Sequence, residues 1–180
     1  MVAARNLMKV PDAAPRDSDA LGLVTVSASN SAFVGAIPEE LYDFGWTPEA
    51  SATGWRDTFD ANTDRGQHFL VLEAEERVVG FLWLKPWAEF ESSYGGEVQA
   101  LYVLPTWQGR GVGRTLLGHA MRLLRAGGKD SVEIGCIREN PNCDFYRHLG
   151  GVEIGRRPNR VDRFETEELF FGWRDLGLLE

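Results

Sequence analysis

Three apolar runs in the middle of the chain predict β-strands. Residues 68–72 and 78–84 flank a short charged segment, which predicts a β-hairpin, although the Asn-Gly pair of the tightest turns is absent from it. A third run, residues 98–104, ends at Pro105, because proline cannot donate a hydrogen bond to a neighbouring strand. The pattern therefore predicts three successive strands in this part of the chain.

Apolar side chains then recur with the helical period, which predicts one long amphipathic helix. Its apolar stripe is formed by Leu116, Leu117, Ala120, Met121 and Leu124. Arginines lie off this stripe, and the pair Gly127 and Gly128 predicts the end of the helix, because glycine adopts the left-handed conformation that closes many helices.

The C-terminal part repeats the alternation on a smaller scale. Residues 132–137 alternate between apolar and other positions, which predicts a strand, and a short helix is expected over residues 144–149. Residues 152–155 and 168–173 predict a terminal pair of strands. Strand, strand, strand, helix, strand, helix, strand, strand is a mixed α/β layout around one sheet.

The N-terminal third is harder to interpret. Residues 1–19 show no periodicity and predict a loose tail. Residues 21–33 stay ambiguous, because their aliphatic side chains favour a strand whereas the polar residues before them could cap a helix. Pro38 and Pro48 each predict a helix start, since proline is favoured in the first helical turn.

Length and composition limit the class of protein. With 180 residues the chain is about the size of one domain, and we expect a flexible tail over residues 1–17 and a single domain over residues 18–176. Apolar residues make up 43% and aromatic residues 11%, which excludes a disordered chain. The sequence holds no apolar run that could span a bilayer and no secretory signal, so a cytoplasmic protein is predicted.

Charge and cysteine content narrow the partners. The chain carries 19 Lys and Arg against 27 Asp and Glu, a net charge of −8, and such a chain binds nucleic acid poorly. An acidic surface attracts a cationic small molecule or an amine-bearing peptide, or it serves only solubility. Cys136 and Cys143 lack the spacing of a structural zinc site, so we expect no metal and treat both as packing residues.

The segment between the third strand and the long helix carries the chemistry. It consists of Gln108, Gly109, Arg110, Gly111, Val112, Gly113 and Arg114. Glycines at such a turn let successive N–H groups point into one concavity, and the helix N-terminus adds partial positive charge, so a phosphate fits there. A turn that merely needs glycine is the alternative. The ATP-binding loop and the dinucleotide fingerprint both require residues that this segment lacks.

Gln108, Gly111 and Gly113 fit instead the acetyl-CoA motif Q/R-x-x-G-x-G/A. The chain resembles the core of the GCN5-related N-acetyltransferase (GNAT) superfamily over residues 100–105, 108–113, 139–142, 145–146 and 149–151. The order of these motifs along the chain is more specific than the glycine motif alone. The resemblance implies an α/β (α+β) fold with a single mixed, mostly antiparallel sheet flanked by helices, the GNAT acyl-CoA acyltransferase fold.

The resemblance also implies how acetyl-CoA is held. In this family, main-chain groups of the strand before the loop bind the pantetheine arm, which points to Leu101, Tyr102 and Val103. The loop amides from Gly109 to Arg114 would bind the pyrophosphate, and the Arg114 side chain either adds a contact or stays solvated. Asn140 matches the asparagine that commonly touches the pantetheine arm, with a simple turn at the end of the strand as the alternative.

Two residues match the family's catalytic positions. Tyr146 corresponds to the general acid that protonates the leaving CoA thiolate, or else it is a packed aromatic residue. Glu97 resembles the position from which many relatives supply a carboxylate base, with a solvated glutamate as the alternative. Asn140 and Tyr146 are six residues apart, one fewer than is usual in the family, so either the short helix starts later or one assignment is wrong.

The loop before the third strand offers residues for an acceptor. Glu89 and Glu91 could gather a cationic group there. The aromatic residues that could wall an acceptor pocket, or pack as ordinary core, are Trp83, Trp87, Phe90 and Tyr94.

Taken together, the resemblance implies transfer of an acetyl group from acetyl-CoA to a primary amine by direct attack in a ternary complex. Neither nucleic acid nor a membrane is an expected partner, and a homodimer is one option for assembly. A non-catalytic acyl-CoA-binding regulatory protein on the same fold is the alternative. A nucleotide-binding enzyme is a third reading, which both missing nucleotide motifs contradict.

Overall fold

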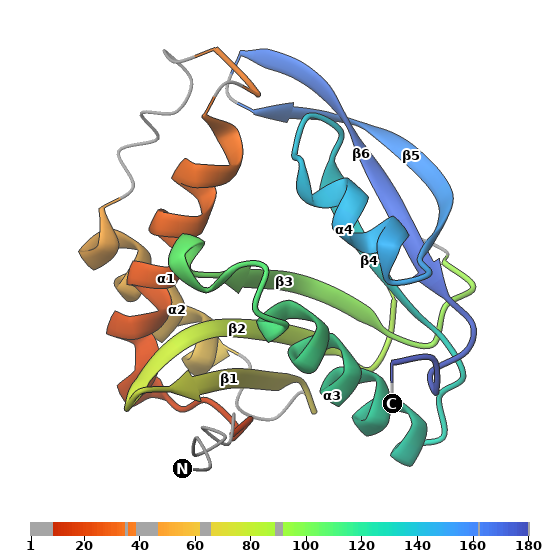
Figure 1. The fold of residues 1–180 in the computed structure, drawn as a ribbon, viewed down its shortest axis with the longest axis horizontal. Coiled ribbons are helices and arrows are strands. Elements are labelled where there is room, and N and C mark those ends of the chain that lie inside the picture. Colours follow the sequence, from red (N-terminus) through yellow and green to blue (C-terminus); the bar gives the residue numbers. More distant parts are fainter. Residues whose placement is uncertain are drawn as a thin grey trace, which may run out of the picture.

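The computed structural model describes residues 9–34, 36–38, 47–61, 66–88, 92–161 and 163–179. They form a six-stranded sheet with the strand order β1-β2-β3-β4-β6-β5 (Figure 1). The strands are β1 (His68–Ala74), β2 (Arg77–Lys85), β3 (Glu97–Val103), β4 (Val132–Ile137), β5 (Val152–Val161) and β6 (Phe164–Trp173). Among these six strands only the β3–β4 pair is parallel, which confirms the predicted single mixed, mostly antiparallel sheet.

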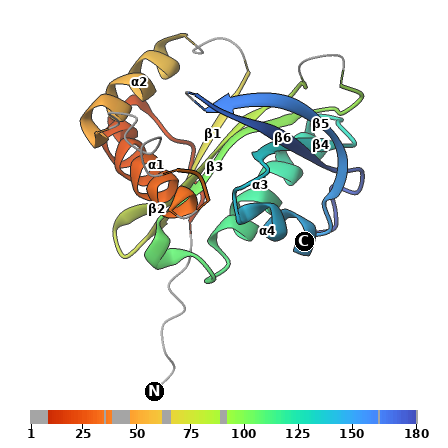
Figure 2. The same cartoon turned by 90° about the horizontal axis from the view of Figure 1, so that it is seen from above.

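Helices cover both faces of this sheet. They are α1 (Ser18–Phe33), α2 (Pro48–Ala61), α3 (Val112–Ala126) and α4 (Asn142–His148), with short 3₁₀ turns at Pro15–Asp17 and Pro105–Trp107. Figure 2 shows α1 and α2 on one face of the sheet and α3 and α4 on the other. Within the described ranges, none of the helices is both long and apolar enough to cross a membrane.

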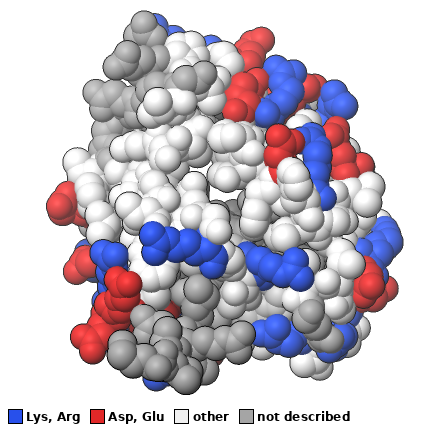
Figure 3. All heavy atoms as spheres, in the orientation of Figure 1, with Lys and Arg blue, Asp and Glu red and all other residues white. Residues whose placement is uncertain are grey.

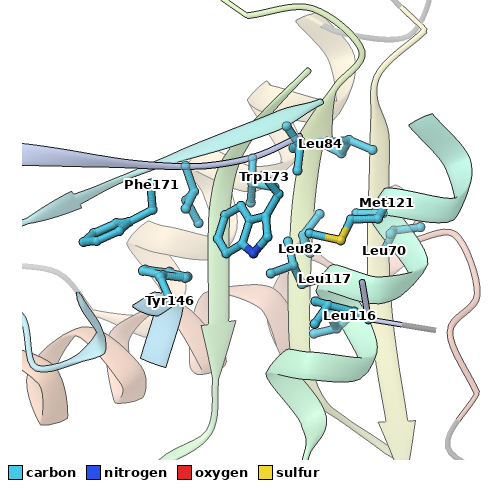
Figure 4. Close-up of a cluster of buried hydrophobic side chains, with 14 of the residues drawn as sticks. Leu70, Leu82, Leu84, Leu116, Leu117, Met121, Tyr146, Phe171 and Trp173 are labelled. Carbon is cyan, nitrogen blue, oxygen red and sulfur yellow. The ribbon is translucent and has the colours of Figure 1, made fainter. Parts of the chain in front are cut away.

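The larger core lies between the sheet and α3. Alternate side chains of β2 point toward the apolar stripe of this helix, so that Leu82 and Leu84 pack with Leu116, Leu117 and Met121 (Figure 4). All five side chains are fully buried. Burying a side chain of this size contributes about 1.5–3 kcal/mol. The core therefore fixes α3, and with it the loop at its beginning, against the sheet.

The end of α3 follows the predicted glycine pattern. Gly128 has a φ of 77°, in the left-handed region, directly after the helix. Its N–H donates to the carbonyl of Arg125 at 3.0 Å, and the N–H of Lys129 donates to the carbonyl of Leu124 at 2.9 Å. These two bonds satisfy carbonyl groups that the last helical turn leaves unpaired.

The predicted hairpin between β1 and β2 is confirmed. Two residues connect the strands, Glu75 with a φ of 51° and Glu76 with a φ of 61°. Positive φ at both central positions gives the turn a twist that matches the flanking strands. Positive φ is sterically unfavourable for glutamate. Because two glutamates stand where an Asn-Gly pair is usual, the sequence gives only a weak signal for this turn.

α1 settles the ambiguity of residues 21–33 in favour of a helix. Its Leu21 and Val24 belong to a second core, which also contains Trp55 from α2. The indole N–H of Trp55 donates to the hydroxyl of Thr25 at 3.0 Å. Because α1 is buried against both the sheet and α2, it lacks the polar face by which a helix is recognised in a sequence.

The other N-terminal predictions have different outcomes. α2 begins at Pro48, as predicted, and the N–H of Ala50 donates to the side chain of Thr47 at 3.2 Å. The helix expected from Pro38 would extend into residues 39–46, which lie outside the described residues.

Residues 9–13, expected to belong to a loose tail, pair with the edge of β1. The N–H of Glu73 donates to the carbonyl of Lys9 at 3.1 Å, and the N–H of Ala13 donates to the carbonyl of Phe69 at 2.6 Å. Main-chain pairing of this kind leaves little trace in side-chain pattern, which explains why it was not predicted.

β5 and β6 extend beyond the predicted residues 152–155 and 168–173. The added part is rich in charged residues that pair across the hairpin, such as Arg156, whose guanidinium lies 3.8 Å from the carboxylate of Glu167. β5 also contains Pro158, which an edge strand tolerates because one side of it makes no ladder bonds. The charged residues and the proline thus mask the alternating pattern by which a strand is recognised in a sequence.

Candidate functional site

The sheet opens between its two parallel strands. β3 and β4 are in register only at two pairs, Glu97 with Glu133 and Val98 with Ile134. Beyond these pairs the strands diverge toward the end of α1 (Figure 1). Within the described residues, the main-chain N–H and C=O groups on the edge of β3 that faces β4 therefore have no strand partner over residues 99–103. Such an edge can bind an extended ligand that carries amide groups.

A β-bulge lies at the point where the strands separate. Trp83 of β2 is paired with Ala100 of β3, and Leu84 is paired with Val98, so Gln99 has no partner. An extra residue of this kind bends its strand and frees its backbone groups. The bulge therefore turns β3 away from β4 and places Gln99 at the apex of the opening.

A cavity of about 580 Å³ fills the opening. The sequence-predicted residues that line it are Leu101, Tyr102, Val103, Gln108, Gly109, Gly111, Val112, Gly113, Arg114, Asn140 and Tyr146. Four residues near the end of α1, including Ser29 and Phe33, close its other side. In Figure 3 a hollow opens among uncharged side chains, and Lys and Arg side chains border it near the loop before α3. Segments that are distant in sequence thus form one concave site.

The glycines of the loop have two distinct roles. Gly109 and Gly111 have φ values of 70° and 84°, so both need the left-handed freedom of glycine. Gly111 is also the residue before α3, and no side chain of the described residues caps this helix. The first N–H groups of α3 are consequently available to an anion, and the helix dipole favours one there.

Gly113 serves packing rather than conformation. A methyl group at this position would lie 2.9 Å from the ring of Phe145. Glycine therefore lets the first turn of α3 approach α4 closely, and it keeps the cavity wall continuous between the two helices.

Gln108 and Arg110 both stabilise the loop, and of the two only Gln108 lines the cavity. The amide of Gln108 donates to the carbonyl of Val103 at 3.2 Å, which ties the loop to the end of β3. The guanidinium of Arg110 lies 5.0 Å from the centre of the Trp107 ring, a cation–π contact, and Arg110 does not line the cavity. Of the predicted loop residues, Arg110 is thus the one that the fold directs elsewhere.

Tyr146 is buried at the wall of the cavity. Only 5% of its surface is exposed, and its ring packs against Phe171 and Trp173 with centroid distances of 5.6 and 6.3 Å (Figure 4). Burial raises the pKa of its phenol well above the ordinary value, and the neighbouring Cys136 adds to this shift. The phenol therefore stays protonated and can donate a hydrogen bond into the cavity.

Asn140 takes part in the turn before α4. Its side-chain oxygen accepts a hydrogen bond from the N–H of Asn142 at 2.9 Å, and its own N–H donates to the carbonyl of Ile137. Asn140 therefore forms a turn at the end of β4, the alternative that the sequence left open, and it also lines the cavity. α4 begins at Asn142, two residues earlier than predicted.

The two cysteines and Trp83 contribute mainly to packing. Cys136 and Cys143 are both buried, and Cys143 donates to the carbonyl of Ile137 at 3.4 Å. Trp83 stacks on Phe69 with a centroid distance of 5.4 Å, and both rings pack against the second core. In the described ranges, no group of three or more His, Cys, Asp or Glu is arranged to hold a metal ion.

The loop predicted to receive an acceptor is described only in part. Glu89, Phe90 and Glu91 lie outside the described residues. The ring of Tyr94 covers Gly172 of β6 and stacks with the guanidinium of Arg174 at 4.4 Å. Tyr94 thus packs against the end of β6.

A second, smaller cavity adjoins the first. It measures about 190 Å³ and is lined by Glu97, Val98, Gln99, Gly135, Arg157, Glu168 and Phe170. Gln99, Gly135 and Glu168 line both cavities. Glu97, which is 9% exposed, lines the smaller cavity only. Sequence reasoning missed Glu168, because only the pairing of β6 with β4 places it at this junction.

Comparison with solved structures defines the class of fold. A structure from Salmonella typhimurium, described as a putative acetyltransferase with its cofactor acetyl-CoA, superposes with a TM-score of 0.68 and covers 94% of each chain at 24% identity. The six-stranded sheet with helices on both faces is thus the GNAT acyltransferase fold.

The family itself is shown by the sequence comparison. Residues 33–150 match the model of the acetyltransferase (GNAT) family, and the chain belongs to this family. It is 28% identical over 112 residues to the uncharacterized N-acetyltransferase YuaI of Bacillus subtilis, covering 62% of this chain and 65% of that protein, less than two thirds of its length. It is also 28% identical over 123 residues to the L-amino acid N-acyltransferase MnaT of Escherichia coli, covering 68% of each.

Proposed function

We propose that this protein is an acetyl-CoA-dependent N-acetyltransferase that acts on a primary amine. The observation that carries the proposal is the continuity of one cavity from the parted strands β3 and β4 to the first turn of α3. An acyl-CoA has amide groups in its arm and phosphates at one end, so it needs an unpaired strand edge and an anion site in this order.

Each part of acetyl-CoA has a matching group in the cavity. Main-chain groups of Leu101, Tyr102 and Val103 lie on the unpaired edge of β3 and would bind the pantetheine arm. The amides from Gly109 to Arg114 would bind the pyrophosphate, where a positive helix end and Arg114 favour negative charge. The donor set therefore fits the substrate without a metal ion.

The acetyl group would then lie near the bulge at Gln99. A neutral amine attacks the thioester carbon, the C–S bond breaks, and its electron pair goes to sulfur. Tyr146 is the residue that would stabilise this thiolate, because its buried phenol keeps its proton and can donate a hydrogen bond to sulfur. Direct attack requires no acyl-enzyme. Cys136 lines the large cavity, but its hydrogen bond with Cys143 and its burial raise the pKa of its thiol, which disfavours a thiolate nucleophile there.

The smaller cavity is the place where the acceptor would enter. It adjoins the large cavity at Gln99, and its two carboxylates, Glu97 and Glu168, favour a cationic amine. MnaT, by its name, acylates amino acids, which supports an amine as the acceptor. A volume of about 190 Å³ suits a small amine or the terminal part of a larger one. We expect the reaction to occur in the cytoplasm, where a homodimer is an option.

A non-catalytic acyl-CoA-binding protein is the second candidate function. The six-residue spacing between Asn140 and Tyr146 favours it, because the family's spacing is one residue longer. This candidate predicts that acetyl-CoA binds and is never consumed.

The test is release of free thiol from acetyl-CoA in the presence of amines. The panel comprises L-amino acids, a polyamine and short peptides with a free N-terminus, with the N-acetylated form of each compound as its control. We expect amine-dependent thiol release and an acetylated product for at least one amine. Tight binding of acetyl-CoA without turnover across the panel would favour the second candidate, and absence of binding would contradict both.

A further inference from the structure

We propose that Glu168 is the catalytic residue that accepts a proton from the acceptor amine. This assignment rests on the proposed function and replaces Glu97, the residue that the sequence favours for the role. It is carried by the position of Glu168 at the junction of the two cavities, and by the space that Gly135 leaves for its carboxylate.

The sheet register brings Glu168 to the reacting centre. Glu168 lies on β6 opposite Ile137 of β4, and it lines both the cavity for the acyl donor and the cavity for the acceptor. Gln99, the bulge residue of β3, lines the same two cavities. A carboxylate at this junction can reach an amine that approaches a thioester held at the bulge.

Gly135 provides the space that this carboxylate occupies. A methyl group added at Gly135 would overlap Oε1 and the carboxyl carbon of Glu168. The side chain therefore lies across the backbone of β4, directed into the opening. Any larger residue at position 135 would displace it, which links the presence of glycine in this strand to the position of the carboxylate.

The carboxylate of Glu168 has no hydrogen bond or ion pair with any residue in the described ranges. Burial raises its pKa above the ordinary value, an effect that the charge of Arg157 opposes. The charged and titratable groups around it are Arg157 on β5, Cys136 on β4 and Glu97 on β3. A desolvated carboxylate with an elevated pKa is a better proton acceptor than a solvated one.

Glu97 occupies a different environment. Across the sheet it lies in a row with Lys85 of β2 and Glu133 of β4, and all three residues are buried. Ser92 donates to one carboxylate oxygen of Glu133 at 2.6 Å. Glu97 is thus one member of a buried charged row beside the site, and it does not line the cavity for the acyl donor.

The chemical step balances with Glu168 as proton acceptor. The amine arrives as its neutral form, and its nitrogen forms a bond to the thioester carbon. The N–H proton that the intermediate must lose passes to the carboxylate of Glu168. The C–S bond then breaks, and sulfur takes the electron pair as a thiolate that Tyr146 stabilises by a hydrogen bond. The thiolate takes a proton from solvent and Glu168 returns its proton to solvent, so no net proton is gained or lost.

Two substitutions test this assignment, with one matched control. Glu168→Gln keeps size and removes the basic oxygen, and we expect kcat/KM for the acceptor to fall by roughly 10²-fold or more while acetyl-CoA affinity stays unchanged. Gly135→Ala should lower kcat/KM in the same way, because the methyl group displaces the carboxylate. Glu165→Gln, an exposed position on the same strand, is the control and should behave as wild type.

The pH profile separates a chemical role from a structural one. With methoxyamine as the acceptor, which is already neutral at the assay pH, an acidic limb of the profile belongs to the enzyme. The wild-type kcat/KM should then fall as the pH drops through the raised pKa of Glu168, and this acidic limb should vanish in Glu168→Gln. The variant that combines Glu168→Gln with Gly135→Ala should have the same kcat/KM as Glu168→Gln alone, since Gly135 acts through the same carboxylate.

The outcomes distinguish this assignment from the proposed function. The wild type could transfer acetyl groups while Glu168→Gln keeps most of the wild-type kcat/KM with an unchanged acidic limb. In that case the proposed acetyltransferase function stands, but Glu168 is not the proton acceptor. Loss of the limb in Glu97→Gln but not in Glu168→Gln would return the role to Glu97. Thermal stabilisation of each variant by acetyl-CoA verifies that it is folded.

Discussion

The two sides of the site are built in different ways. The side that would hold acetyl-CoA is formed largely by residues 99–114, which offer mostly main-chain groups, while α1, β4 and α4 complete its wall. The acceptor side draws on four strands, with the side chains of Glu97, Arg157 and Glu168 around Gly135. One side therefore depends on local backbone geometry, and the other depends on the register of the whole sheet.

This difference determines what a substitution does. A backbone site tolerates exchange of most side chains but fails where a left-handed φ or a close approach requires glycine. A side-chain site responds to loss of a single functional group while the fold remains intact.

The largest effect is expected for Gly111→Glu. The new residue would have to adopt a φ of 84° at the start of α3, and its carboxylate would lie where the pyrophosphate is expected. Conformational strain and charge repulsion together should weaken acetyl-CoA binding roughly 10³-fold. Gly54→Glu, on the exposed side of α2 with open space around it, is the matched control for the added charge. Equal affinities by calorimetry for wild type and Gly111→Glu would remove the loop from the binding site.

Tyr146→Phe should have an intermediate effect that is confined to chemistry. Removing the hydroxyl retains the aromatic packing, so acetyl-CoA affinity should be unchanged while kcat falls by about 10²-fold. Because the pKa of this phenol is raised, it keeps its proton throughout the physiological range, and no alkaline limb of the wild-type profile should arise from it. Steady-state rates over pH provide the measurement. A fully active variant would make Tyr146 a packing residue only.

The smallest effect is expected where the two helices meet. Gly113→Ala would place a methyl group 2.9 Å from the Phe145 ring, so α4 must shift, and we expect a loss of about 1 kcal/mol of stability with a few-fold weaker acetyl-CoA binding. Gly54→Ala in open space should instead raise stability by about 0.5–1 kcal/mol, the ordinary gain for a helix. Chemical denaturation measures both. A gain of stability in Gly113→Ala would show that the Phe145 ring moves aside for the methyl group without cost.

The parts of the fold with local signals could be predicted from the sequence. The stripe of α3 and the strands around it follow from periodicity, and the glycine loop follows from its position before a helix. α1 stayed ambiguous because it is buried on two sides, and the length of β5 was underestimated because its charged residues pair across a hairpin.

In the candidate site, too, only the parts with local sequence signals could be predicted. Most of the predicted loop and strand residues line the cavity, since a backbone site is encoded by consecutive residues. Arg110 turns instead to Trp107, three residues earlier in the same loop, and the glycine motif carries no sign of this contact. Glu168 could not be found, because nothing near it in the sequence shows that β6 pairs with β4 next to the opening.

The most direct test of the account is thermal unfolding of the wild type with and without acetyl-CoA, with ATP and NAD as comparison ligands. Saturation at about 100 times Kd should add about 2.7 kcal/mol, or roughly 5–10 °C for a chain of this length. The account predicts this shift for acetyl-CoA, no comparable shift for ATP or NAD, and its loss in Gly111→Glu. An unchanged midpoint with acetyl-CoA, or an equal shift with all three ligands, would contradict the claim that the opening between β3 and β4 is an acyl-CoA site.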